Sequence, residues 1–177
     1  MSRFIALPLV LIAAAAIHAV DLPRKAPDFT IQMNGAKPLQ LSQYKGKSVV
    51  LAFILTTCTH CQKAVKCLTA DAPQYAPRGL QVLAAAVERD AADHVPEFQR
   101  IFKPAFPVGY STDSDGVLRF MQHPANMVPH MPLIAFIDRA GVIRAQYEGN
   151  DAFLREDAIE ANLRKGIEDL LKAPASK

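Results

Sequence analysis

Mainly apolar stretches along the chain predict the strands of one sheet. The stretches at 48–55, 80–87 and 133–138 show no regular polar–apolar alternation. Runs of this length and composition are typical of strands that are buried on both faces of a sheet. Residues 138–141 predict a turn, and 142–147 predict a strand that pairs with the stretch before it.

The N-terminal part of the chain predicts a β-hairpin. Residues 26–32 alternate in polarity, Asn34-Gly35 is a strong hairpin-turn signal, and 39–41 provide the returning strand. We therefore expect an N-terminal β-hairpin beside the sheet.

Two segments have the apolar period of helices that bury one face. The first begins near Thr59 and is expected to be ended by Pro73 and Pro77-Arg78-Gly79. The second is the C-terminal segment. Their apolar faces consist of Cys61, Ala64, Val65, Leu68 and Ala72 in the first, and of Ile159, Leu163, Ile167 and Leu170 in the second.

The sequence between these two helices predicts two shorter helices. Residues 93–102 form a predicted helix with Pro96 in its first turn. Residues 103–131 are irregular apart from a short helix at 115–122. The order of the elements predicts an α/β domain with a central mixed β-sheet flanked by helices.

The chain begins with a predicted export signal. The fourteen residues 4–17 carry no charge, and they lie between Arg3 and the small residue Ala19. This pattern is typical of a secretory signal peptide, 1–19, and an uncleaved N-terminal anchor is the alternative. Cleavage after Ala19 leaves 20–177 as a single domain, periplasmic or otherwise extracytoplasmic, either soluble or N-terminally anchored.

Charge and composition exclude some classes of function. The formal net charge is only +3, and the basic residues form no run longer than two and no cluster with interleaved aromatic residues. A nucleic-acid-binding protein is therefore not expected. Three cysteines are also too few for a disulfide-stapled scaffold.

Two of the cysteines, Cys58 and Cys61, lie between a predicted strand and the helix that begins near Thr59. At a helix start, unpaired N–H groups and the helix dipole stabilise a thiolate. A second thiol one turn later can attack a mixed disulfide formed on the first. The spacing thus predicts a redox-active disulfide, with Cys58 as nucleophile and Cys61 as resolving cysteine.

Other interpretations of the pair are weaker. A disulfide across two intervening residues closes too short a loop to gain much stability. A zinc site needs further ligands at suitable spacing, and a c-type haem needs a histidine where Gln62 stands. We expect no cofactor and no metal.

The residues 26–30, 41–47 and 132–141, together with the motif Cys58-Thr59-His60-Cys61, resemble the redoxin branch of the thioredoxin-like superfamily. The resemblance is to exported thiol:disulfide oxidoreductases of the TlpA/ResA kind, which are related to the AhpC/TSA peroxidases. It implies a thioredoxin-like fold with this pair as the catalytic site.

The resemblance also implies further site residues. Pro132 holds the place of a cis-proline that packs against the redox-active disulfide. We expect Met131, Thr57 and Thr59 to contact the substrate. The expected partners are exported proteins that contain cysteine and a membrane or periplasmic electron donor or acceptor, and the expected state is a monomer.

Several positions depart from the family pattern. Thr57 stands where a tryptophan is usual, and Ala52 stands where thioredoxins have a buried acid. Glu88 is a candidate substitute, although its position favours a solvated loop carboxylate. We interpret His60 as a catalytic residue that stabilises the reduced form of Cys58 and makes the disulfide more oxidising. The direction of electron flow stays open.

An AhpC/TSA-type peroxidase with antioxidant activity is the nearest alternative. Peroxiredoxins have threonine three residues and proline seven residues before the reactive cysteine. Leu55 and Leu51 occupy these positions for Cys58, and Cys58 and Ile54 occupy them for Cys61. The pattern therefore fails for both cysteines.

A copper-binding thioredoxin-like module is a further alternative. Imidazole, thioether and thiolate are ligands that suit Cu(I). The candidate ligands in the loop before Pro132 are His123, Met127, His130 and Met131.

The third cysteine, Cys67, is predicted to be a small core thiol. It lies six residues after Cys61, about 9 Å along a helix. This exceeds the Cα–Cα limit of about 7 Å for a disulfide.

Overall fold

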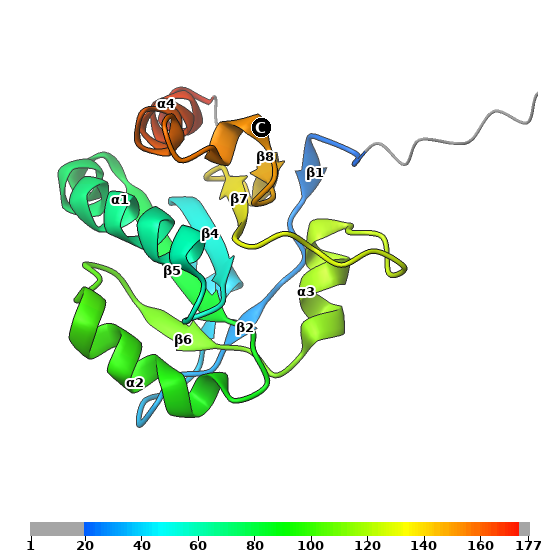
Figure 1. Ribbon diagram of the computed structural model, residues 1–177. Coiled ribbons are helices and arrows are strands. Elements are labelled where there is room, and N and C mark those ends of the chain that lie inside the picture. The colour runs from blue at the N-terminus through cyan, green and yellow to red at the C-terminus, as the bar shows by residue number, and fades with distance from the viewer. Residues whose placement is uncertain (1–19, 174–177) are drawn as a thin grey trace, which may run out of the picture.

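The computed structural model describes residues 20–173, which form a six-stranded sheet with helices on both faces (Figure 1). The predicted signal peptide, 1–19, lies outside the described residues. None of the helices within 20–173 is long and apolar enough to cross a membrane.

The sheet has the strand order β1-β8-β7-β4-β5-β6. The parallel pairs are β4–β5 and β5–β6, and the antiparallel pairs are β4–β7, β7–β8 and β1–β8. The sheet is therefore mixed, as predicted. The strands are β1 (Arg24–Lys25), β4 (Ser48–Ile54), β5 (Leu80–Ala86), β6 (Val108–Tyr110), β7 (Leu133–Ile137) and β8 (Val142–Tyr147).

The central strand β4 is buried along its whole length, which explains its unbroken apolar sequence. Successive side chains point to opposite faces of the sheet, so that β4 contributes to two separate cores. Val50, Ala52 and Ile54 belong to one core, and Val49, Leu51 and Phe53 to the other.

Four helices cover the two faces. The first core is shared by α1 (Thr59–Tyr75), α2 (Ala91–Phe102) and α4 (Ile159–Lys172). The second core is shared by α3 (Ser114–Met121) and the predicted N-terminal hairpin, which consists of β2 (Thr30–Ile31) and β3 (Leu39–Gln40). The predicted α/β class, a central mixed sheet flanked by helices, is thus confirmed.

The predicted effects of two prolines differ from the structure. Helix α1 ends at Tyr75, within the predicted end region from Pro73 to Gly79, but Pro73 lies inside the helix and does not end it. Helix α2 begins at Ala91, so that Pro96 lies beyond its first turn. The N–H that Pro96 lacks would have bonded the carbonyl of Ala92. That carbonyl instead accepts a hydrogen bond from Asn34 Nδ2 at 2.7 Å, which explains why the helix tolerates this proline.

The edge of the sheet also differs from the prediction. Residues 108–110 form β6 within a segment that was expected to be irregular outside its helix. The strand predicted at 26–32 is limited to β2 and a bridge between Gln32 and Tyr110. Pairing with neighbours, rather than local sequence, defines these short strands.

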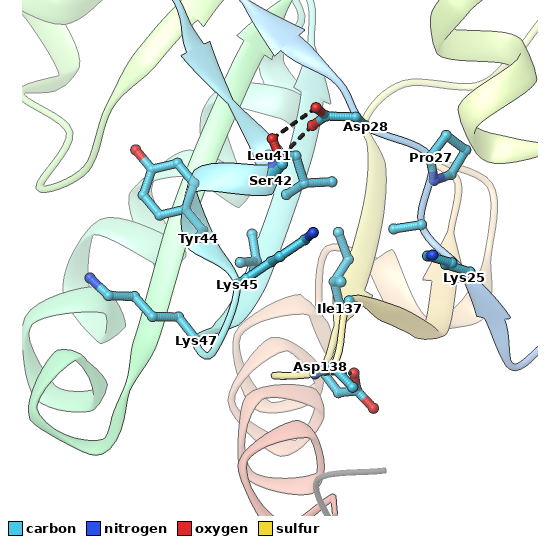
Figure 2. Close-up of a pocket in the computed structure, with 14 residues that line it drawn as sticks. Lys25, Pro27, Asp28, Leu41, Ser42, Tyr44, Lys45, Lys47, Ile137 and Asp138 are labelled. Atoms are coloured by element: carbon cyan, nitrogen blue, oxygen red, sulfur yellow. Dashed lines mark hydrogen bonds between the residues drawn. The ribbon is translucent and has the colours of Figure 1, made fainter. Parts of the chain in front are cut away.

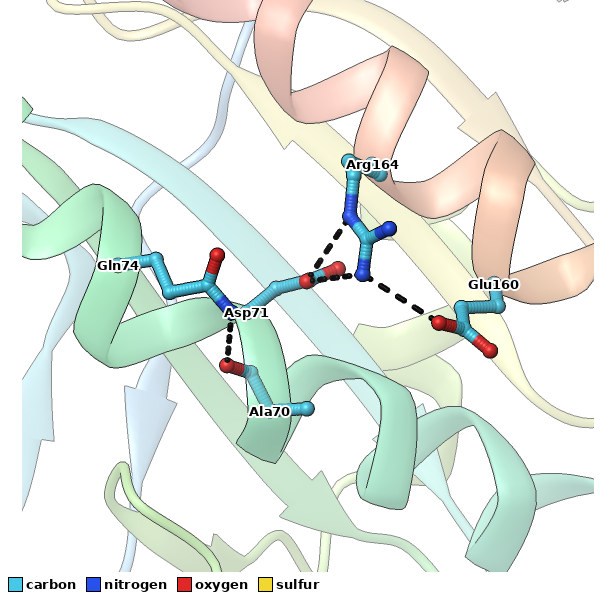
Figure 3. A network of polar contacts seen from close by, with 5 residues as sticks. All are labelled: Ala70, Asp71, Gln74, Glu160 and Arg164. Atoms are coloured by element: carbon cyan, nitrogen blue, oxygen red, sulfur yellow. Dashed lines mark hydrogen bonds and ion pairs between the residues drawn. The ribbon is translucent and has the colours of Figure 1, made fainter.

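An ion pair between the buried Asp71 and the exposed Arg164 joins α1 to α4 (Figure 3). Asp71 is fully buried, and its Oδ1 accepts hydrogen bonds from Arg164 Nε and Nη2 at 3.2 and 2.9 Å. Arg164 also pairs with Glu160. The network fixes α1, the helix that follows Cys58, against the C-terminal helix.

Candidate active site

Cys58 is the N-cap residue of α1, where β4 gives way to the helix. Its backbone is extended (φ −77°, ψ 117°), and α1 begins at Thr59, as predicted. The Cys58 sulfur accepts a hydrogen bond from the Cys61 N–H at 3.3 Å. The sulfur therefore faces the N–H groups at the start of the helix, which have no partner within the helix.

The two cysteines differ in burial. Cys58 is half-buried, whereas Cys61 is 0% exposed, and both are free thiols. Burial raises the pKa of the Cys61 thiol, although the Leu55 N–H, 3.5 Å from its sulfur, opposes this rise. A protein partner can therefore reach Cys58 directly, while Cys61 is shielded.

The loop before β7 lies against Cys58. The Met131–Pro132 peptide bond is cis, in agreement with the expectation for Pro132. The Met131 carbonyl oxygen is 4.0 Å from the Cys58 sulfur. The structure thus brings Met131 and the cysteine pair together, although 69 residues lie between Cys61 and Met131 in the chain.

A glycine that the sequence did not single out positions this loop. Gly149 follows β8, and its N–H donates a hydrogen bond to the His130 carbonyl at 2.7 Å. A Cβ atom at this position would lie 2.3 Å from the Met131 carbonyl oxygen. Only glycine permits this close approach, and the signal in the sequence is a glycine two residues after the end of a predicted strand.

The prediction that Glu88 is a solvated carboxylate is wrong. Its side chain is 20% exposed, and Oε1 accepts hydrogen bonds from the Thr56 N–H at 2.9 Å and from the Thr56 hydroxyl. Oε2 is buried without a hydrogen-bond partner among the described residues. Glu88 is close enough to Cys61 for its charge to contribute to the raised pKa of that thiol.

The parallel pairing of β4 and β5 explains this position. Ile54 and Ala86 are register partners at the carboxyl ends of the two strands. Two residues further along, Thr56 and Glu88 therefore lie side by side. A search for acids at the ends of adjacent parallel strands could have found Glu88.

The other expected site residues surround Cys58 in different ways. Thr57 and Thr59 are exposed on either side of it. The His60 ring donates a hydrogen bond through Nε2 to the Leu154 carbonyl. This contact directs His60 toward the 3-10 turn Ala152–Leu154.

The histidines considered as copper ligands converge on a carboxylate. Glu148 lies 3.3 Å from His123 Nε2 and 3.9 Å from His130 Nδ1. Met127 is 57% exposed. Within 20–173, no group of three or more His, Cys, Asp or Glu side chains has a metal-binding arrangement.

Cys67 packs, half-buried, against the first core, and burial raises the pKa of its thiol. The prediction of a flanking core thiol is confirmed.

Comparisons with known sequences agree with these features. The chain is 25% identical to thiol-disulfide oxidoreductase ResA of Bacillus thuringiensis subsp. konkukian over 147 residues, which are 82% of this chain and 79% of that protein. It is 29% identical to ResA of Geobacillus thermodenitrificans over 126 residues, 71% of this chain and 68% of that protein.

Solved structures show the same fold. One is described as a thiol:disulfide interchange protein DsbE from Chlorobium tepidum, with a TM-score of 0.67 and 23% identity over 84% of this chain and 99% of that one. Peroxidoxin BcpB from Mycobacterium tuberculosis has a TM-score of 0.66 and 16% identity over 87% of this chain and 97% of that one. The AhpC/TSA family matches residues 22–146, and the chain belongs to this family, in the redoxin branch of the thioredoxin-like superfamily.

Proposed function

We propose that this protein is an exported thiol:disulfide oxidoreductase that exchanges disulfides with cysteine-containing exported proteins. The observation that carries the proposal is the asymmetry of the cysteine pair. Cys58 is accessible at the N-terminus of α1, and Cys61 is buried one turn further, with its N–H bonded to the Cys58 sulfur. The matching ResA proteins are named for the same chemistry.

Reduction of a substrate proceeds in two exchanges. The Cys58 thiolate attacks one sulfur of the substrate disulfide, the S–S bond breaks, and the other substrate sulfur leaves as a thiolate that takes up a proton. Cys61 then loses its proton and attacks the Cys58 sulfur, which releases the second substrate thiol and leaves a Cys58–Cys61 disulfide. Oxidation of a substrate dithiol is the same sequence in reverse.

The second exchange needs a proton acceptor because burial keeps the Cys61 thiol protonated. Glu88 is the carboxylate beside the pair, and its Oε2 has no partner within the described residues. We assign Glu88 the role of accepting this proton and passing it to the departing substrate thiolate.

The loop at Met131 and Pro132 supplies the surface for the substrate backbone. The Met131 carbonyl is next to the Cys58 sulfur, so that an extended substrate segment beside this loop brings its own sulfur to Cys58. Thr57 and Thr59 flank the attack position, and His60 adjoins it. The second partner is a membrane or periplasmic electron donor or acceptor.

Catalysed exchange between dithiothreitol and a disulfide-bonded protein tests the proposal. Wild type and Cys67→Ser should be equally active, and Cys58→Ser and Cys61→Ser should lose turnover. Equal turnover by Cys58→Ser would contradict the proposal. Rapid consumption of hydrogen peroxide without disulfide exchange would support the peroxidase alternative instead.

Export is tested separately. Residues 1–25 fused to a reporter that is active only outside the cytoplasm should give activity, and the exported protein should begin at Val20. An inactive reporter would remove the export assignment without affecting the exchange chemistry.

A further inference from the structure

A pocket of about 220 Å³ lies at the end of the sheet opposite the cysteines (Figure 2). Its floor includes Val49 and Ile137, which are register partners near the start of β4 and the end of β7. Cys58 follows the other end of β4, so the proposed exchange chemistry does not use this pocket.

The pocket combines an apolar floor with a cationic rim. Ala26, Leu41, Val49 and Ile137 form the floor, and the lysines at the rim are Lys25, Lys45 and Lys47. Figure 2 shows Lys25 and Lys45 directed toward the pocket from opposite sides, whereas Lys47 points away from it.

The acidic groups of the pocket are already engaged. Asp28 accepts hydrogen bonds from Ser42 N–H at 2.9 Å and from the Ser42 hydroxyl at 2.8 Å. The buried Asp138 pairs with Arg144 at 2.6 Å. Within 20–173, neither Lys25 nor Lys45 forms an ion pair. The hydrogen bonds from Ser42 leave the charge of Asp28 in place, and Asp28 is close enough to Lys45 for their charges to interact. Because Arg144 compensates Asp138, the lysines of the pocket still outnumber its remaining acid, and the pocket is positively charged overall above an apolar surface.

We propose that this pocket binds a small amphiphilic carboxylate. The alkyl chain lies on the apolar floor, and the carboxylate lies between the ammonium groups of Lys25 and Lys45. If a methylene group needs about the volume of a water molecule, roughly 30 Å³, the pocket holds about seven of them. A drug-sized ligand needs a pocket of about 300–1,000 Å³, so a short-chain acid fits better.

Titration with sodium octanoate, followed through backbone amide NMR shifts of the reduced protein, tests the proposal. Saturable shifts are expected at Leu41, Val49 and Ile137. Lys25→Glu and Lys45→Glu replace an attraction by a repulsion and should each weaken binding about tenfold. Lys37→Glu changes an exposed lysine that does not line the pocket, so it is the matched control and should bind as wild type does.

Two further ligands test separately the contributions of the alkyl chain and of the carboxylate charge to binding. 1-Octanol, which lacks the charge, and butyrate, which lacks most of the chain, should each bind about tenfold more weakly than octanoate. Cys58→Ser should bind octanoate normally. Three results would overturn the proposal. Wild type, Lys25→Glu and Lys45→Glu could bind octanoate with equal affinity, or wild type could bind octanol as tightly as octanoate. The NMR shifts could also be confined to another surface of the protein.

Discussion

Cys58 and Cys61 differ in the access that a protein substrate has to them, and this predicts the behaviour of their serine variants. Cys61→Ser retains the more accessible nucleophile but cannot resolve the mixed disulfide, so it should accumulate substrate proteins bound through Cys58. Cys58→Ser should accumulate none. Non-reducing electrophoresis with mass spectrometry measures both, and Cys67→Ser is the control. Trapping through Cys61 would mean that the roles are reversed.

The raised pKa of Cys61 predicts a pH dependence of the reduced protein. Because the folded thiol stays protonated, its contribution to stability is complete below the unfolded pKa of about 8.5 and is lost as pH rises above it. At pH 9.5 the free energy of unfolding of wild type relative to Cys61→Ala should be lower than at pH 7 by about 1 kcal/mol. Urea titrations under reducing conditions measure this difference, and a pH-independent difference would contradict the burial of Cys61.

Glu88 is predicted to act in the second exchange. Glu88→Gln can still accept the Thr56 hydrogen bonds but cannot take up a proton. Resolution of the mixed disulfide should therefore slow about a hundredfold, while attack by Cys58 is nearly unchanged. Acid quenching and mass spectrometry of the mixed disulfide separate the two rates.

The matched control for this variant is Glu97→Gln, a substitution of an exposed glutamate on α2. If Glu88→Gln slows both exchanges equally, the residue positions the loop rather than moving a proton.

At the scale of elements, the loop before β7 depends on the glycine after β8. In Gly149→Ala the added Cβ must displace the Met131 carbonyl, which lies beside Cys58. Because a small displacement of reacting groups strongly lowers the rate of a reaction, kcat/KM of exchange should decrease by a factor of about 10 to 100. The neighbouring variant Asn150→Ala should retain activity. Unchanged kcat/KM in Gly149→Ala would show that the loop position is unimportant.

Elements with a long local pattern were predicted well, and those defined by pairing were not. The apolar run of β4 and the start of α1 at Thr59 are visible in the sequence because burial on both faces and the helix period repeat over many residues. The strand β6 has only three residues and depends on β5 and Gln32 for its pairing. Pro96 is tolerated inside α2 because Asn34, from the distant hairpin, bonds the carbonyl that it leaves free.

At the scale of the molecule, the fold gathers the site from segments that are far apart in the chain. The cysteine pair and Pro132 were predicted from their motifs and order. Glu88 was misjudged because its role depends on the pairing of β5 with β4. Gly149 was missed because its role depends on the contact between the end of β8 and the Met131 loop. These contacts between distant segments cannot be predicted from the local sequence around either residue.

The central claim is that Cys58 and Cys61 form a reversible redox pair. Its most direct test is equilibration in thiol–disulfide buffers, followed by alkylation and peptide mass spectrometry. We predict a two-electron transition between the dithiol and a Cys58–Cys61 disulfide, at a potential between about −270 mV, as for thioredoxin, and about −120 mV, as for DsbA, while Cys67 stays reduced. A disulfide that includes Cys67, or no Cys58–Cys61 disulfide at any buffer potential, would contradict the account.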